Sequence, residues 1–208
     1  MKYKYIFWDW NGTIMDDVQV ALDAVNVMLN QWNRFPISLE EYRRAMDTPI
    51  LRFYEQFFDM EETSFDWIAK VFNEYYREHQ NEIPLHQGVE EKLELFQKNN
   101  VTQVVLSSSS QEIIERYAGM YEIKSYFQDI LGASDLLAAS KIDRAIKYFK
   151  EKQIPLEEAV LIGDAVHDYE VAKELGIDCI LLSCGHQDKE SLEKCGCPVY
   201  ETLLQWEM

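Results

Sequence analysis

A short apolar run that ends in an acid constrains the fold of this chain more than any other feature. Residues 3–8 lead into Asp9, and Gly12 and Thr13 follow shortly after. An apolar run of this length beside turn residues predicts a buried strand. Gly12 tolerates a positive φ and therefore permits a sharp turn. Ligands bind at the carboxyl ends of strands in an open parallel sheet, so we expect Asp9 at the mouth of a site.

On its own this segment is also compatible with a hairpin turn, because Asn-Gly pairs are common in hairpins. Later segments favour a strand end. Two further apolar runs also end beside polar residues. Residues 104–106 precede Ser107, and residues 159–162 precede Gly163, Asp164 and Asp168. Lys141 lies between these two runs in the sequence. The strand ends therefore supply a carboxylate, a hydroxyl and two more carboxylates, in that order along the chain.

Together these residues resemble the four motifs of the haloacid dehalogenase (HAD) superfamily, most of whose members are phosphatases. The family's first motif, Asp-x-Asp-Gly-Thr, reads Asp9-Trp10-Asn11-Gly12-Thr13 in this chain. The other motifs are matched by Ser107, by Lys141 without the proline that often follows it, and by Gly163, Asp164 and Asp168. The matches run in order over nearly the whole chain. The chain is most similar to the phosphoglycolate-phosphatase-like branch, which carries a helical cap.

The expected fold class is α/β, with a Rossmann-like parallel-sheet core and an inserted all-helical cap. Residues 17–82 show helical spacing only, and Ser38 and Glu41 form a capping-box signature within them. After Pro84 strands and helices alternate, which predicts a parallel sheet with right-handed crossovers. We therefore expect a core made of 1–16 and 83–208. The cap, 17–82, is expected to close over the site as in the resembled family, with hinges near 16–18 and 82–85.

The resemblance implies that Asp9 is a nucleophile and forms an aspartyl-phosphate that water then cleaves. It also implies a Mg²⁺ site made by the Asp9 carboxylate, the backbone carbonyl of Asn11 and Asp164. Asp168 would join this site directly or through water. Carboxylates are hard oxygen donors of the kind that Mg²⁺ prefers. The alternative is that Asp164 and Asp168 merely cap the helix that follows them.

The phosphate-binding residues implied by the resemblance are Ser107, the N–H of Ser108 and Lys141. Lys141 would bridge Asp9 and the phosphate. The serines at a predicted helix start are equally typical of ordinary N-capping, and a helix N-terminus also binds anions. A lysine is more often a solvated surface residue, so Lys141 is selected by the resemblance alone.

Asn11 departs from the family pattern, which usually has an aspartate that gives a proton to the leaving group. An amide cannot do this, although its backbone carbonyl can still bind metal. General acid–base catalysis contributes typically about 10²–10⁴-fold. We therefore expect a slow phosphatase, or one whose substrate has a good leaving group. On sequence alone, Asn11→Asp should raise turnover of alkyl phosphates.

The leading function is therefore Mg²⁺-dependent hydrolysis of a small phosphorylated metabolite. The alternative is a non-hydrolytic, phosphate-binding or regulatory relative that lost turnover at Asn11. A response-regulator receiver also uses Asp, Ser/Thr and Lys on a parallel sheet, but its phosphorylated aspartate lies mid-chain. Among cap residues, Arg43, Arg44 and Arg52 are candidates to meet an anionic substrate, with solvated helix faces as the alternative. His79, His86 and His186 are expected at the surface or in linkers.

Charge excludes several classes of partner. The 208 residues carry a formal net charge of −17, which disfavours nucleic acid and acidic membrane surfaces. No apolar stretch approaches the roughly 18–20 residues that span a bilayer, and the N-terminus lacks signal-peptide features. We expect a cytoplasmic protein. The pairs Cys184/His186 and Cys195/Cys197 could be drawn as a zinc site, but their one-residue spacing is atypical and reduced thiols are the simpler interpretation.

Overall fold

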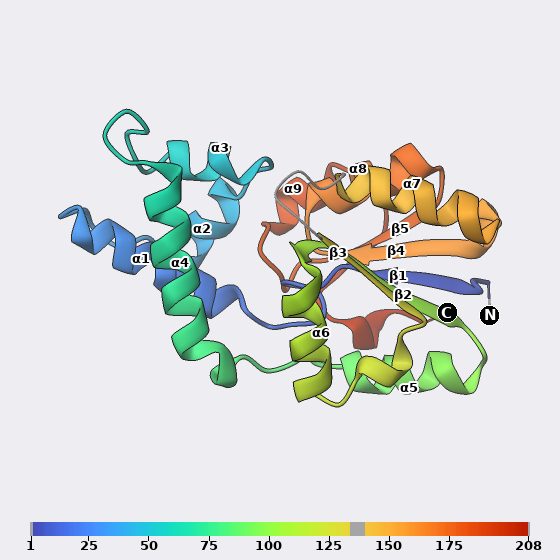
Figure 1. The fold of residues 1–208 in the computed structure, drawn as a ribbon. Helices are drawn as coiled ribbons and strands as arrows, with labels where there is room; N and C mark the ends of the chain where they lie inside the picture. The colour runs from blue at the N-terminus through green and yellow to red at the C-terminus, as the bar shows by residue number, and fades with distance from the viewer. Residues whose placement is uncertain (1, 134–139, 208) are drawn as a thin grey trace.

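The computed structural model describes residues 2–133 and 140–207, which form a parallel sheet between helices and a separate group of helices to one side (Figure 1). Within these residues six strands pair in the order β3-β2-β1-β4-β5-β6, all parallel. The strands are β1 (Tyr5–Trp8), β2 (Thr102–Ser110), β3 (Asp129–Ala133), β4 (Ala159–Gly163), β5 (Asp178–Leu182) and β6 (Val199–Tyr200). The central strand β1 pairs with β2 and β4, so Asp9 emerges from the middle of the sheet. The predicted α/β parallel-sheet fold is confirmed.

Helices cover both faces of the sheet (Figure 1). One face packs on α5 (Val89–Lys98) and α6 (Gln111–Met120). The other packs on α7 (Lys141–Lys152), α8 (Val166–Leu175) and α9 (Lys189–Glu193). Successive strand side chains alternate between these two cores, with Ile6 and Trp8 in the first and Phe7 in the second. Burial on both faces explains why the strands read as continuous apolar runs. Short 3₁₀ helices lie at Lys124–Tyr126, Leu156–Glu158 and Leu203–Gln205.

The chain between β1 and α5 is helical. It contains α1 (Val18–Gln31), α2 (Leu39–Ala45), α3 (Ile50–Glu55), α4 (Phe65–His79) and a 3₁₀ turn at Gln80–Glu82. These helices bury their own apolar core, which includes Met28, Phe53 and Ile68. The predicted capping box at the start of α2 is confirmed, since the Ser38 and Glu41 side chains each bond the other's backbone N–H. Figure 1 shows this group beyond the carboxyl ends of the strands.

The two connections to this helical group run side by side. The N–H of Asp16 donates to the carbonyl of Pro84 at 2.9 Å, and the N–H of His86 donates to that of Ile14 at 2.9 Å. The predicted hinge positions fall on these paired segments. The division into a core of 1–16 and 83–208 and a cap of 17–82 stays a prediction. No helix in the described ranges is both long and apolar enough to cross a membrane.

Two strands differ in extent from the sequence expectation. β2 continues to Ser110 instead of ending at Leu106, with an irregular register before its last pair. The apolar pattern predicts β3 only at Ile130 and Leu131, and in the structure the strand also includes Asp129, Gly132 and Ala133. A side chain at Gly132 would lie 2.6 Å from the backbone of Gln111, so the close approach of α6 requires glycine there. Both departures involve polar or small residues whose strand geometry is set by neighbours.

Candidate active site

A buried lysine joins two carboxylates at the carboxyl edge of the sheet. Asp9 follows β1, and its N–H donates to the carbonyl of Ile162 on β4 at 2.9 Å. Lys141, the first residue of α7, places Nζ 2.6 Å from Oδ1 of Asp9 and 2.6 Å from Oδ1 of Asp168. The lysine side chain is only 3 % exposed, so it is not the solvated surface residue that its type would suggest.

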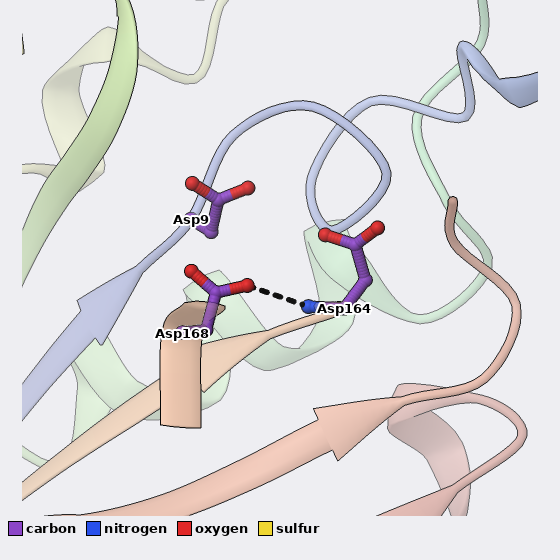
Figure 2. Close-up of side chains that lie close together, drawn as sticks. All are labelled: Asp9, Asp164 and Asp168. Carbon is purple, nitrogen blue, oxygen red and sulfur yellow. Dashed lines mark hydrogen bonds between the residues drawn. The ribbon is translucent and has the colours of Figure 1, made fainter. Parts of the chain in front are cut away.

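Asp168 also organises the turn after β4. Its Oδ2 accepts from the N–H groups of Asp164 and Ala165, each at 3.1 Å, and Figure 2 draws the first of these bonds. Both oxygens of Asp168 are therefore engaged, one by the lysine and one by the backbone. A side chain at Gly163 would lie 2.2 Å from Cγ of Asp168, which explains the glycine before Asp164.

Three carboxylates converge at this edge (Figure 2). One oxygen from each of Asp9, Asp164 and Asp168 lies within 4.8 Å of the others. Asp164 is fixed by two hydrogen bonds, from Oγ1 of Thr13 at 3.0 Å and from the N–H of His186 at 2.7 Å. This is the oxygen-rich donor set that a hard divalent cation would use.

Burial makes these charges costly. It raises the pKa of Asp9 to about 7, although the Lys141 ammonium opposes the shift. Burial likewise raises the pKa of Asp164 to about 6, against the opposing effect of His186. Burial opposes the charge of Lys141, but Asp168 and Asp9 outweigh it and raise the pKa of the ammonium. The Lys141 ammonium contacts two of the three carboxylates and His186 lies beside the third, and a divalent cation would neutralise the remaining negative charge.

The serine segment lies at the same edge. Ser107 is buried, and its Oγ accepts from the N–H of Ser109 at 3.2 Å. Ser108 is exposed. The residue at the N-cap of α6 is Ser110, and its side chain makes no capping bond. Side-chain capping of this helix, the alternative drawn from sequence, is wrong for Ser110.

The side chain of Asn11 is held on both sides. Its Nδ2 donates to Oδ2 of Asp17 at 2.8 Å and to Oη of Tyr76 at 3.2 Å. Its Oδ1 accepts from Oγ of Ser109 at 2.5 Å. Sequence reasoning identified Asn11 but none of its three partners. They come from the start of α1, from α4 and from the end of β2, and no motif links these positions.

His186 lies in the loop after β5 and belongs to the site, a part that the sequence interpretation did not give it. Its Nε2 lies 3.2 Å from Oδ1 of Asp17, and its Nδ1 lies 2.9 Å from Oη of Tyr42 on α2. Burial opposes the imidazolium, but Asp17 and Asp164 outweigh it and raise the pKa of His186 to about 9. The residue follows β5, and the rule that sites form at carboxyl strand ends could have found it.

The arginines of the helical segment do not act alike. Arg43 donates from Nε to the carbonyl of Gly185 at 2.8 Å and from Nη2 to that of Cys184 at 2.5 Å. It therefore docks α2 on the loop after β5. Arg44 pairs with Glu40 on the exposed helix face.

In the described part of the chain the three aspartates are the only group of metal-ligand type, so the cysteine–histidine zinc alternative finds no support.

Comparison with known proteins identifies the family. The model of the haloacid dehalogenase-like hydrolases matches residues 6–182. The chain belongs to this family. A phosphoglycolate phosphatase of Pseudomonas fluorescens is 26 % identical over 192 residues, covering 88 % of this chain and 70 % of the relative. The HAD-like chain is accordingly a phosphatase, as its sequence motifs predicted.

Solved structures share the fold of this HAD-like phosphatase. A haloacid dehalogenase-like hydrolase from Streptococcus pneumoniae matches with a TM-score of 0.83 at 19 % identity, covering 98 % of this chain and 96 % of that one. CbbY from Rhodobacter sphaeroides, solved in complex with phosphate, matches with a TM-score of 0.75 at 19 % identity and the same coverage.

Proposed function

We propose that this HAD-like phosphatase hydrolyses a small phosphate monoester with the help of Mg²⁺, through an aspartyl-phosphate on Asp9. One observation carries the proposal. The buried Asp9 carboxylate shares Lys141 with Asp168, and Asp164 completes a cluster of three carboxylates. An ionised, oriented carboxylate beside a cationic group is what a nucleophile for phosphoryl transfer requires.

The metal site we propose uses Asp9, Asp164 and the backbone carbonyl of Asn11. Bound Mg²⁺ would offset the charge of the transferred phosphoryl group and of the clustered carboxylates. Asp168 would act indirectly, because its oxygens already accept from Lys141 and from two backbone N–H groups. In this arrangement Asp168 fixes the lysine and the turn that carries Asp164.

Each of these residues then has a separate role in the proposed reaction. A carboxylate oxygen of Asp9 attacks phosphorus, and the bond from phosphorus to the leaving oxygen breaks. Lys141 favours the ionised form of Asp9 against the effect of burial and offsets charge on the phosphoryl group. Ser107 and the N–H of Ser108 would hold its free oxygens. Water then attacks the phosphorus of the aspartyl-phosphate, which releases inorganic phosphate and restores the carboxylate.

The leaving oxygen receives no proton from Asn11, because the amide is not an acid. Its N–H groups are also directed to Asp17 and Tyr76. We therefore propose slow turnover of substrates with poor leaving groups. The same observation favours the second candidate function, a relative that binds phosphate without efficient hydrolysis.

The proposed substrate class is a small phosphorylated metabolite of the cytoplasm. Relatives bear the name phosphoglycolate phosphatase. The side chains that would recognise the part of the substrate beyond its phosphate are proposed to belong to the helical segment. We propose that residues 17–82 act as the cap, with Arg43 fixing α2 against the loop after β5.

A panel of phosphorylated metabolites, with an aryl phosphate as a generic substrate, tests the function. Phosphate release is measured with Mg²⁺ and with a chelator. Release that requires Mg²⁺ and disappears in Asp9→Asn supports the phosphatase. No release from any ester, combined with inorganic phosphate binding by calorimetry, would instead support the non-hydrolytic alternative.

A further inference from the structure

Asp17 is the most densely bonded side chain near the site, and no sequence motif selected it. It is 2 % exposed and stands just before α1, yet it makes no capping bond to that helix. Its carboxylate is turned toward the first-motif turn. Oδ1 accepts from the N–H of Gly12 at 2.8 Å and lies 3.2 Å from Nε2 of His186. Oδ2 accepts from Nδ2 of Asn11 at 2.8 Å and from Oη of Tyr76 at 2.9 Å.

These four partners come from separate parts of the fold. Gly12 and Asn11 form the turn that carries the proposed metal-binding carbonyl. Tyr76 lies on α4 of the helical segment, and His186 lies in the loop after β5. A buried carboxylate is stable only when it is fully hydrogen-bonded or paired with a cation, and Asp17 meets both conditions. It therefore links the turn, the helical segment and the loop through one side chain.

The carboxylate also constrains what can stand at position 11. The amide nitrogen of Asn11 faces Oδ2 of Asp17 at 2.8 Å, while Ser109 donates to its oxygen. An aspartate in the same place would set two buried carboxylates against each other, and one would have to bind a proton or move. Asparagine has the same shape and supplies the N–H that Asp17 needs.

We propose that Asp17 is a positioning residue of this active site, and that its carboxylate is the reason asparagine replaces aspartate at position 11. Asp17 holds the turn that follows Asp9 in register with α4. The positioning role rests on the phosphatase function proposed above. The coupling between positions 11 and 17 does not, because it is a property of the folded chain.

A reciprocal exchange isolates this coupling. In the double variant Asn11→Asp/Asp17→Asn, the amide and the carboxylate trade places. The new amide at position 17 can donate to the new carboxylate at position 11. The Tyr76 hydroxyl, which now donates to Asp17 and accepts from Asn11, can instead donate to position 11 and accept from position 17. The N–H of Gly12 can still donate to the side-chain oxygen at position 17. The exchange therefore preserves the hydrogen bonds between positions 11, 17 and 76 and moves the negative charge away from His186, whereas Asn11→Asp alone brings two carboxylates together.

The test compares the native protein, both single variants and the double variant by thermal unfolding without metal. Asp16→Asn is the matched control, since Asp16 is the neighbouring residue and its side chain is 47 % exposed. Asn11→Asp should melt roughly 5–10 °C below the native protein. The double variant should recover most of this loss, and Asp16→Asn should melt near the native temperature. If the losses in melting temperature of the two single variants simply add up in the double variant, the proposal is overturned. If Asn11→Asp does not fold at all, a folded double variant supports the coupling and an unfolded one refutes it.

Aryl phosphate kinetics test the positioning role in the same proteins at a temperature where each is folded. A displaced turn should lower kcat roughly 10- to 100-fold in Asn11→Asp, with a smaller change in KM. The reciprocal exchange should restore most of that loss. Native-like kcat in Asn11→Asp would contradict the positioning role. Failure of the native protein to hydrolyse any ester would reject the proposed function, while the unfolding comparison would still report on the coupling.

Discussion

The ammonium of Lys141 lies 2.6 Å from the carboxylate of Asp9, and both side chains are nearly inaccessible to water. The same nitrogen is 2.6 Å from Asp168. A lysine held between two carboxylates can serve stability and chemistry at once. It compensates buried negative charge in the resting protein and lies beside the atom proposed to attack phosphorus.

Lys141→Gln should therefore destabilise the fold as well as slow catalysis. Removing one partner from a buried ion pair costs about 3–5 kcal/mol, because the remaining charges lose their compensation. Lys147→Gln is the matched control on the same helix, since Lys147 is 75 % exposed and lies 3.9 Å from Glu151. Its effect should stay within about 0.5 kcal/mol. Urea unfolding measures both, and equal effects would show that Lys141 does not compensate the buried charge.

Asp9→Asn should reduce phosphate release to background while the protein remains folded. The amide cannot act as the nucleophile, but Lys141 keeps Asp168 as its partner. Asp66→Asn is a suitable control because Asp66 is exposed in the first turn of α4. Phosphate release and circular dichroism are measured on both variants. Full activity in Asp9→Asn would remove Asp9 from the mechanism.

Mg²⁺ should raise the melting temperature of the native protein, because a ligand that binds only the folded state stabilises it by mass action. At a concentration near 100 times the dissociation constant the gain is about 2.7 kcal/mol, or several degrees for a chain of this size. Asp164→Ala should abolish the shift. Asp178→Asn, at the opposite edge of the sheet, should retain it. A full Mg²⁺ shift in Asp164→Ala would place the metal elsewhere.

The metal-free protein should lose stability as pH rises from about 5 to 9. The pKa of Asp9 and Asp164 is raised by burial from 3.8 to about 7 and about 6. The folded state therefore keeps protons that the unfolded chain has already released, and rising pH favours unfolding up to about 7. Burial opposes the charge of His186, but Asp17 and Asp164 raise its pKa from 6.5 to about 9. The charged His186 therefore stabilises the folded state fully below pH 6.5, and this contribution is lost as the pH rises through 9.

Melting temperatures measured in a chelator across this pH range show whether stability falls as pH rises. Asp9→Asn should flatten the lower part of the profile, since one of the two raised carboxyl groups is gone. Burial lowers the pKa of His86, which acts in the opposite direction, so the difference between the native and Asp9→Asn profiles is decisive, and identical slopes between pH 5 and 7 would contradict the assignment.

The predictable part of this site follows a simple physical rule. Asp9, Ser107, Asp164 and Asp168 each stand after an apolar run, and parallel strands bring their carboxyl ends to one edge. Lys141 required the family motif, because nothing in its local sequence distinguishes it from other lysines. The rule also fails where strand residues are small or polar, as in the extension of β2 to Ser110.

The contacts made by Asp17, Tyr76 and Arg43 could not be predicted, for a different reason. Their contacts depend on how the helical segment lies against the sheet, and local periodicity carries no information on that arrangement. Asp17 reads as an ordinary residue before a helix, yet its carboxylate points away from the helix. The sequence therefore located the charged cluster and missed the side chains that tie it to α2 and α4.

The leaving group should reveal what Asn11 does to catalysis. An aryl phosphate leaves without a proton and an alkyl phosphate does not, so the native aryl-to-alkyl rate ratio should be large. The structure changes the expectation for Asn11→Asp alone, since the new carboxylate would face Asp17 at the 2.8 Å that now separates amide and carboxylate. We expect this single variant to gain no alkyl phosphate turnover.

The reciprocal Asn11→Asp/Asp17→Asn variant removes that repulsion and restores, at position 11, the carboxylate that the family pattern usually has there. It should lower the aryl-to-alkyl ratio by raising alkyl turnover, by at most about 10²–10⁴-fold. Both rates are measured at saturating Mg²⁺, and the Mg²⁺ shift in melting temperature verifies that metal still binds. An unchanged ratio in a protein that binds Mg²⁺ would mean that a group other than position 11 delivers the proton. The limiting step would then lie outside the first motif, and Tyr76, which contacts Asn11, and His186, which contacts Asp17, would be the next to replace.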